Sequence, residues 1–149
     1  FLTKNLHFHF LSSYFINFKI KKSILKHKIT FKKQKYKNFD NIELLDPIYD
    51  IDTLTEIRQN CEFYVHGHSA GGTNPSLVEM MHFSKPILCF DCSYNRATTE
   101  DKAIYFQDVN ALRTYLNHDV AIDYGEVMRE IARRRYTWKI VKSQYLDLL

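Results

Sequence analysis

The residues best suited to chemistry lie in segment 63–79, which reads FYVHGHSAGGTNPSLVE. Three of the four glycines in this 149-residue chain, Gly67, Gly71 and Gly72, fall here, between an apolar run and a helix start. Glycine concentrated between a strand and a helix lets the backbone approach a ligand closely. The segment therefore predicts either phosphate binding at a helix N-terminus or a serine nucleophile, because residues 67–71 also spell G-x-S-x-G.

The serine-hydrolase interpretation needs a nucleophile elbow, in which a helix follows G-x-S-x-G directly. Pro75 lies six residues after Ser69, where that helix would already be running and proline is costly. The downstream histidines are His82 and His118, and His82 falls on the helix that follows the loop. These features count against the interpretation, so an α/β serine hydrolase acting through Ser69 is kept as the alternative function. The P-loop and G-x-G-x-x-G patterns fail, since Thr73 replaces the required lysine and Ser69 a required glycine.

The phosphate interpretation has its own physical basis. Asn74 is a good N-cap and Pro75 a good first helical residue, so free N–H groups and the helix dipole face the loop. Gly71 and Gly72 remove side chains where a diphosphate would approach. Glu79, one turn into the helix, is placed to accept hydrogen bonds from a ribose diol, or is a solvated carboxylate that complements the helix. Together these residues suit a nucleotide diphosphate-sugar.

Metal and redox chemistry have weaker support. His66 and His68 lie at i, i+2 on one strand face, but the sequence offers no third ligand, so we expect no metal. Cys89 and Cys92 match C-x-x-C at the end of an apolar strand instead of the start of a helix. We expect reduced cysteines in or near the core.

Strands and helices alternate in the pattern of a parallel sheet. This predicts a Rossmann-like α/β domain with flanking helices over residues 38–149. The loops 67–74 and 92–99 both leave strands at the carboxyl edge, so we expect them to share one cleft. The expected strands are 41–45, 63–66, 86–91 and 103–106, and the expected helices are about 50–60, 74–83, 109–116 and from about 124 onward.

Two of these helices carry detailed expectations. Thr53 and Glu56, three residues apart, predict a capping-box start, with Asp50 and Asp52 beside it. Residues 133–135 are three arginines, expected on a solvated face. Four apolar side chains of the last helix follow helical spacing and are expected as core contacts: Trp138, Val141, Tyr145 and Leu148.

Charge is divided unevenly along the chain, whose net charge is +4. Residues 1–39 contain ten of the 21 Lys and Arg residues and no acid, leaving 21 − 10 = 11 bases against 17 acids in residues 40–149. We interpret residues 1–37 as a poorly specified basic segment, with a membrane-contacting arm as the alternative. No apolar run reaches the length of a transmembrane helix.

The strings YVHGHSAGGTNPSLVE at 64–79 and FSKPIL at 83–88 resemble the donor-binding half of glycosyltransferase family 4. These are retaining enzymes built from two Rossmann-like domains. FDCSYNRATTE at 90–100 and YTWKI at 136–140 are similar to a bacterial subgroup that includes rhamnosyltransferases of surface polysaccharide synthesis. The resemblance covers about residues 38–149.

The resemblance implies roles for particular residues. Glu79 matches the second glutamate of the family's E-x7-E motif, which binds the nucleotide ribose. Gly71 stands where the first glutamate would be, so backbone groups or His68 would contact the transferred sugar instead. Asn95 and Arg96 in the adjoining loop would contact donor or acceptor, or be structural. The backbone expected to meet the donor sugar and phosphates belongs to Gly71, Gly72, Thr73 and Asn74.

The family's basic pair and its acceptor domain precede this region, and neither is recognisable in residues 1–37. The resemblance therefore implies a truncated, cytoplasmic, hexosyltransferase-type glycosyltransferase, with its catalytic residues unknown. Its partners would be a nucleotide-sugar donor, a glycan or lipid-linked acceptor held by the missing N-terminal domain, and the inner membrane surface at its periphery. We expect no cofactor and no nucleic acid. The chain alone should transfer no sugar, and a non-catalytic remnant is the second alternative.

Overall fold

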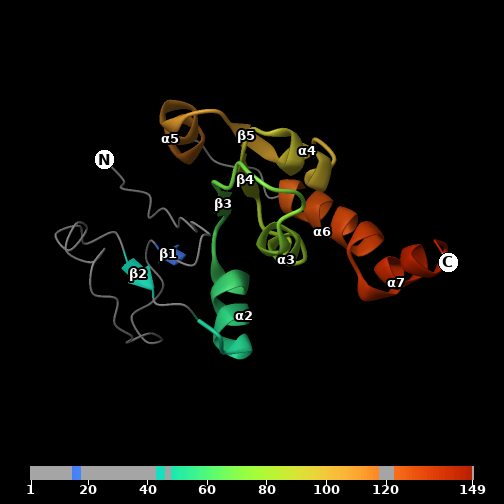
Figure 1. Ribbon diagram of the computed structural model, residues 1–149. Helices are drawn as coiled ribbons and strands as arrows, with labels where there is room; N and C mark the ends of the chain where they lie inside the picture. Colours follow the sequence, from blue (N-terminus) through green and yellow to red (C-terminus); the bar gives the residue numbers. More distant parts are fainter. Residues whose placement is uncertain (1–14, 18–42, 46–47, 118–122, 149) are drawn as a thin grey trace.

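Three short parallel strands form the centre of the structure, a computed structural model that describes residues 15–17, 43–45, 48–117 and 123–148. They are β3 (Tyr64–His66), β4 (Ile87–Phe90) and β5 (Ile104–Phe106), hydrogen-bonded in the order β3-β4-β5 (Figure 1). Val65 lies opposite Leu88, and Leu88 opposite Ile104. The expected parallel α/β arrangement is confirmed.

The helices α3 and α6 cover one face of the sheet, and α5 covers the other. On the first face Tyr64, Ile87 and Cys89 pack with apolar side chains of α3 and α6. On the second face Val65 and Leu88 pack with α5. Burial on both faces explains why β4 reads as a continuous apolar run. The helices are α2 (Ile51–Asn60), α3 (Pro75–Met81), α4 (Ser93–Thr99), α5 (Val109–Asn117), α6 (Asp123–Arg135) and α7 (Trp138–Leu146).

Gly125 allows α6 to lie against the turn after α3. A Cβ atom at this position would lie 2.1 Å from the backbone oxygen of Ser84, which itself has a positive φ of 55°. No side chain fits in that gap without moving the backbone. The contact fixes α6 against α3 and so closes the first face of the sheet.

The strands β1 (Phe15–Asn17) and β2 (Glu43–Leu45) form a separate antiparallel pair, with Phe15 opposite Leu45. Leu45 is buried and packs with Ile57 of α2. The strand expected at 41–45 is confirmed over its described residues. Most of the basic segment 1–37 lies outside the described residues.

Two expectations about local structure are wrong. Helix α2 begins at Ile51, because the carboxylate of Asp50 accepts the N–H of Thr53 at 2.8 Å; Thr53 is inside the helix instead of capping it. Residues 92–99 were expected as a loop but contain α4. Its Thr98 and Thr99 hydroxyls donate to carbonyl oxygens four residues earlier, at 2.8 and 2.7 Å, so the polar groups of these residues of low helix propensity are satisfied within the helix.

The end of the chain also differs from expectation. Trp138, Tyr145 and Leu148 are 87%, 70% and 82% exposed instead of buried, and α7 contains no buried residue. Helix α7 extends beyond α6, away from the sheet (Figure 1), and Val141 alone among the four expected core contacts is half-buried. Helical spacing predicts the apolar stripe but does not predict whether another element packs against it.

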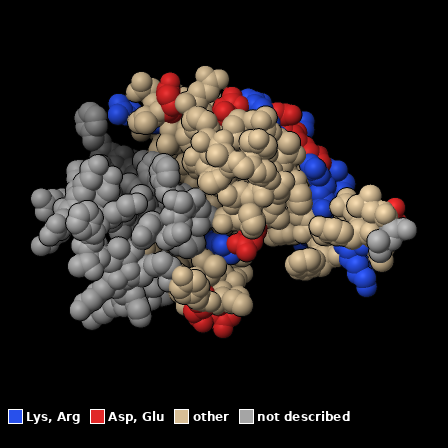
Figure 2. Space-filling view, in the orientation of Figure 1, with Lys and Arg blue, Asp and Glu red and all other residues tan. Residues whose placement is uncertain are grey.

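Charged side chains intermix along the edge formed by α4 and α6 (Figure 2). Arg134 and Arg135, expected to be merely solvated, both reach Glu100, at 2.6 and 3.3 Å. Arg135 also donates to the carbonyl oxygen of Ala97 at 2.9 Å. Within the described residues no helix has both the length and the apolar character needed to cross a bilayer.

Candidate functional site

The loop 67–74 connects β3 to α3 at the carboxyl edge of the sheet. Residues 69–73 are all exposed. Gly71 has φ +84°, a conformation that side chains rarely adopt, so glycine is required there by the backbone itself. A Cβ atom on Gly71 or Gly72 would meet nothing within 4 Å. The loop therefore presents open backbone at both glycines, as the sequence predicted.

Asn74 caps α3 as expected. Its side-chain oxygen accepts the N–H of Ser76 at 3.0 Å, and its backbone oxygen accepts the N–H groups of Leu77 and Val78. Pro75 is the first residue of the helix. The cap fixes where the loop ends and the helix begins.

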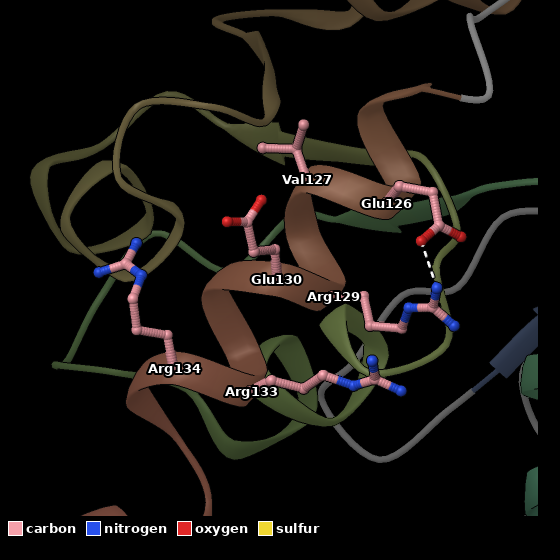
Figure 3. Close-up of a pocket in the computed structure, with 6 residues that line it drawn as sticks. All are labelled: Glu126, Val127, Arg129, Glu130, Arg133 and Arg134. Atoms are coloured by element: carbon pink, nitrogen blue, oxygen red, sulfur yellow. Dashed lines mark hydrogen bonds and ion pairs between the residues drawn. The ribbon is translucent and has the colours of Figure 1, made fainter.

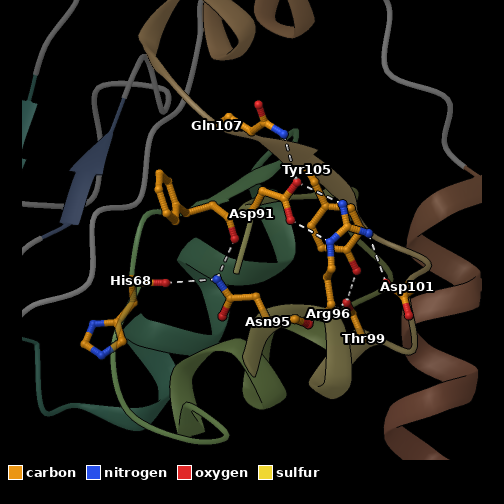
Figure 4. Close-up of polar contacts among 9 residues, drawn as sticks. His68, Asp91, Asn95, Arg96, Thr99, Asp101, Tyr105 and Gln107 are labelled. Atoms are coloured by element: carbon orange, nitrogen blue, oxygen red, sulfur yellow. Dashed lines mark hydrogen bonds and ion pairs between the residues drawn. The ribbon is translucent and has the colours of Figure 1, made fainter. Parts of the chain in front are cut away.

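Asn95 joins the loop to the neighbouring strand. It is 3% exposed, and its Nδ2 donates to the carbonyl oxygens of His68 at 2.9 Å and Phe90 at 2.8 Å (Figure 4). The start of α4 is thus bonded both to the glycine-rich loop and to the end of β4. These bonds hold the glycine-rich loop and the start of α4 together at one edge of the sheet. The amide nitrogen of Asn95 is engaged by these two carbonyl groups.

Arg96 is held by three groups of its own domain. Its Nε and Nη2 bind the carboxylate of Asp91 at 2.5 and 2.9 Å, and its Nη1 binds Asp101 at 3.0 Å (Figure 4). Its guanidinium carbon lies 4.2 Å from the ring centre of Tyr105. The hydrogen bonds from Arg96 lower the pKa of Asp91. These contacts give Arg96 a structural position at the end of β4.

Glu79 makes an ion pair that the sequence did not predict. Its Oε2 lies 2.5 Å from Nη2 of Arg58 on α2, and the side chains are 53% and 10% exposed, respectively. One feature of the sequence does point to such a pair. Arg58 is four residues after Leu54 and next to Ile57, on the apolar face of α2. A lone cation on such a face calls for an anionic partner.

His66 lies beneath the loop in the core. It is fully buried, and its Nδ1 is 3.1 Å from the hydroxyl of Tyr64. Burial, and secondarily the nearby His68, lowers the pKa of His66 to about 4, so the ring is neutral at physiological pH. Its Nε2 is buried without a hydrogen-bond partner in the described part of the chain. The rings of His66 and His68 are 6.1 Å apart.

The alternative chemistries find little structural support. Among the described residues, Ser69 makes no hydrogen bond to a histidine, and α3 begins six residues after it, so the elbow geometry is absent. His118 lies outside the described residues. The described residues include no group of three His, Cys, Asp or Glu that could hold a metal. All three cysteines are free, as expected, and burial raises the pKa of Cys61 to about 11.

A surface hollow of about 540 Å³ lies along α6 (Figure 3). Two of its lining residues, Arg129 and Glu126, form an ion pair at 2.5 Å. None of the predicted site residues lines it; its lining is Glu126, Val127, Arg129, Glu130, Arg133 and Arg134.

The fold and the loop define an α/β protein with an exposed glycine-rich connection at the carboxyl edge of a parallel sheet. No protein-family model, curated protein or solved structure matches the chain.

Proposed function

We propose that this chain is the Rossmann-like, donor-binding part of a retaining glycosyltransferase that uses a nucleotide diphosphate-sugar. The observation that carries the proposal is the pair of hydrogen bonds from Asn95, which hold the loop at His68 against the end of β4 while residues 69–73 stay exposed. A loop fixed at one end and open at its glycines is suited to bind a ligand through its backbone.

The proposed roles follow the positions of the side chains. Backbone N–H groups of residues 71–74 bind the diphosphate and take up negative charge as the diphosphate leaves. Glu79 accepts hydrogen bonds from ribose hydroxyls through the oxygen that Arg58 does not hold. His68, half-buried at the start of the loop, contacts the transferred sugar. The nucleophile is a hydroxyl group of the acceptor.

Transfer needs donor and acceptor held together, so the chain alone is expected to bind donor without transferring sugar. The proposed acceptor is a glycan or lipid-linked sugar bound by a further domain, and the proposed reaction, by resemblance, is rhamnosyl transfer in bacterial polysaccharide synthesis at the cytoplasmic face of the membrane.

The proposal is tested by binding of UDP-, GDP- and dTDP-sugars, measured by saturation-transfer NMR and calorimetry. We expect at least one to bind, and Glu79→Gln to weaken its binding about tenfold, the value of one charge-assisted hydrogen bond. Glu62→Gln is the matched control, because Glu62 is exposed on the segment between α2 and β3. A folded chain that binds none of the donors at millimolar concentration would leave the non-catalytic remnant as the better interpretation.

A further inference from the structure

Arg58 occupies an unfavourable place for a cation. It is 8% exposed on the face of α2 that carries buried Ile57, and its guanidinium carbon lies 5.9 Å from the ring centre of Phe83. Its Nε is buried without a hydrogen-bond partner among the described residues. Desolvating a guanidinium and leaving one donor unsatisfied opposes folding, and an apolar side chain often serves stability better at such a site. The cation–π contact with Phe83 and the ion pair with Glu79 offset part of this cost.

The arginine does act on Glu79. Its Nη2 holds Oε2 of Glu79 at 2.5 Å from the buried side, while the glutamate side chain remains 53% exposed. An exposed glutamate would otherwise move among several rotamers. Held at one oxygen, the carboxylate keeps a fixed direction, and its Oε1 makes no contact with the described residues that would occupy it. The pair therefore presents one oriented acceptor oxygen to solvent, one turn into the helix that follows the glycine-rich loop.

We propose that Arg58 is a positioning residue that orients Glu79 toward the ribose hydroxyls of a nucleoside diphosphate. This inference rests on the proposed function and adds a specificity determinant to it. Preference for a ribose with free hydroxyls over a 2′,3′-dideoxyribose depends on Arg58, although Arg58 itself does not touch the ligand. A guanidinium performs this task better than an ammonium group, because it is more weakly hydrated, so its burial costs less, and its planar group lies against the ring of Phe83.

The test compares UDP, GDP and dTDP with their 2′,3′-dideoxy counterparts by calorimetry on the full chain. The measured quantity is the ratio of the two dissociation constants for each base. We expect a ratio of about ten in the wild type, the value of a charge-assisted hydrogen bond, and about one in both Arg58→Met and Glu79→Gln. Arg58→Lys, which retains the cation and the aliphatic stem, is expected to give an intermediate ratio. The matched control is Arg113→Met, on the exposed surface of α5, with an unchanged ratio.

The outcomes separate this inference from the proposed function. A wild-type ratio of about ten that persists in Arg58→Met, with Glu79→Gln abolishing it, overturns the role of Arg58 and leaves the donor site intact. If Arg58→Met does not fold, as shown by its amide spectrum, a full wild-type ratio in folded Arg58→Lys overturns the role equally. A folded wild type that binds none of these nucleotides overturns the proposed function and this inference with it.

Discussion

The side-chain amide of Asn95 lies 2.9 Å from the carbonyl oxygen of His68, although the two residues are 27 positions apart in the chain. Through this bond and the second one to Phe90, a nearly buried amide on α4 sets the position of the glycine-rich loop after β3. The loop and the end of β4 are therefore expected to move as one unit. This relationship is the structural basis of the proposed ligand site.

Asn95→Ala is expected to destabilise the protein by about 1–3 kcal/mol, because two carbonyl oxygens lose their donor in a nearly buried setting. Urea unfolding at neutral pH measures the free energy of unfolding. The backbone amide chemical shifts of residues 67–69 should also move, because the carbonyl group of His68 loses its hydrogen bond. Asn110→Ala, at an exposed position of α5, is the matched control. Equal stability of the two variants, with unchanged loop chemical shifts in Asn95→Ala, would contradict the proposed role of Asn95.

Acid is expected to destabilise the fold through His66. The folded pKa of about 4 is below the ordinary value of 6.5, so the unfolded chain binds a proton that the folded chain does not between these values. The stability that depends on neutral His66 is thus complete above pH 6.5 and falls as pH falls toward 4. The lost free energy is on the order of 3 kcal/mol.

Urea unfolding from pH 7 to pH 4.5 measures this dependence. The variant His66→Phe should show a shallower loss of stability with acid than the wild type. His82→Phe, which changes an exposed histidine at the end of α3, should keep the wild-type slope. A slope in His66→Phe equal to that of the wild type would contradict neutral burial of His66.

Alanine substitutions at Gly125 and Gly72 are expected to have different effects, the first on stability and the second on ligand binding. Gly125→Ala places a Cβ atom 2.1 Å from the backbone oxygen of Ser84 and should destabilise the protein by about 3 kcal/mol, outweighing the roughly 1 kcal/mol that alanine adds to a helix. Gly72→Ala meets nothing within 4 Å and should change stability by less than about 0.5 kcal/mol.

The same Gly72→Ala variant should bind the nucleotide-sugar more weakly, because its methyl group occupies space proposed for the diphosphate. Thermal unfolding and calorimetric titration of both variants provide the comparison. Wild-type affinity in Gly72→Ala would argue against backbone contact at this part of the loop.

The sequence predicted the features that depend on local chemistry and failed where distant parts of the chain decide. The apolar run of β4 and the Asn74–Pro75 start of α3 specify their structures locally, and both predictions are confirmed. Helix α4 was missed because its sequence has low intrinsic helix propensity, while the hydrogen bonds of Asn95 with His68 and Phe90 tie the helix to the sheet edge. Its low intrinsic propensity is overridden by contacts that the sequence does not show.

The candidate site shows the same division. An unusual backbone conformation at Gly71 could be predicted, since glycine is the residue that adopts a positive φ most readily. The pairing of Arg58 with Glu79 could not, because 21 residues and β3 separate them in the chain. The stripe of α7 was recognised by its spacing, yet spacing cannot say whether a neighbouring element covers it.

The most direct test of the central claim is a titration of the ¹⁵N-labelled chain with UDP, GDP and dTDP, followed by two-dimensional NMR of the backbone amides. The account predicts that at least one nucleotide shifts the amides of residues 71–74 and of Glu79, with little change along α6. A dispersed spectrum that none of the three changes, or shifts confined to the hollow on α6, would contradict a donor site at the glycine-rich loop.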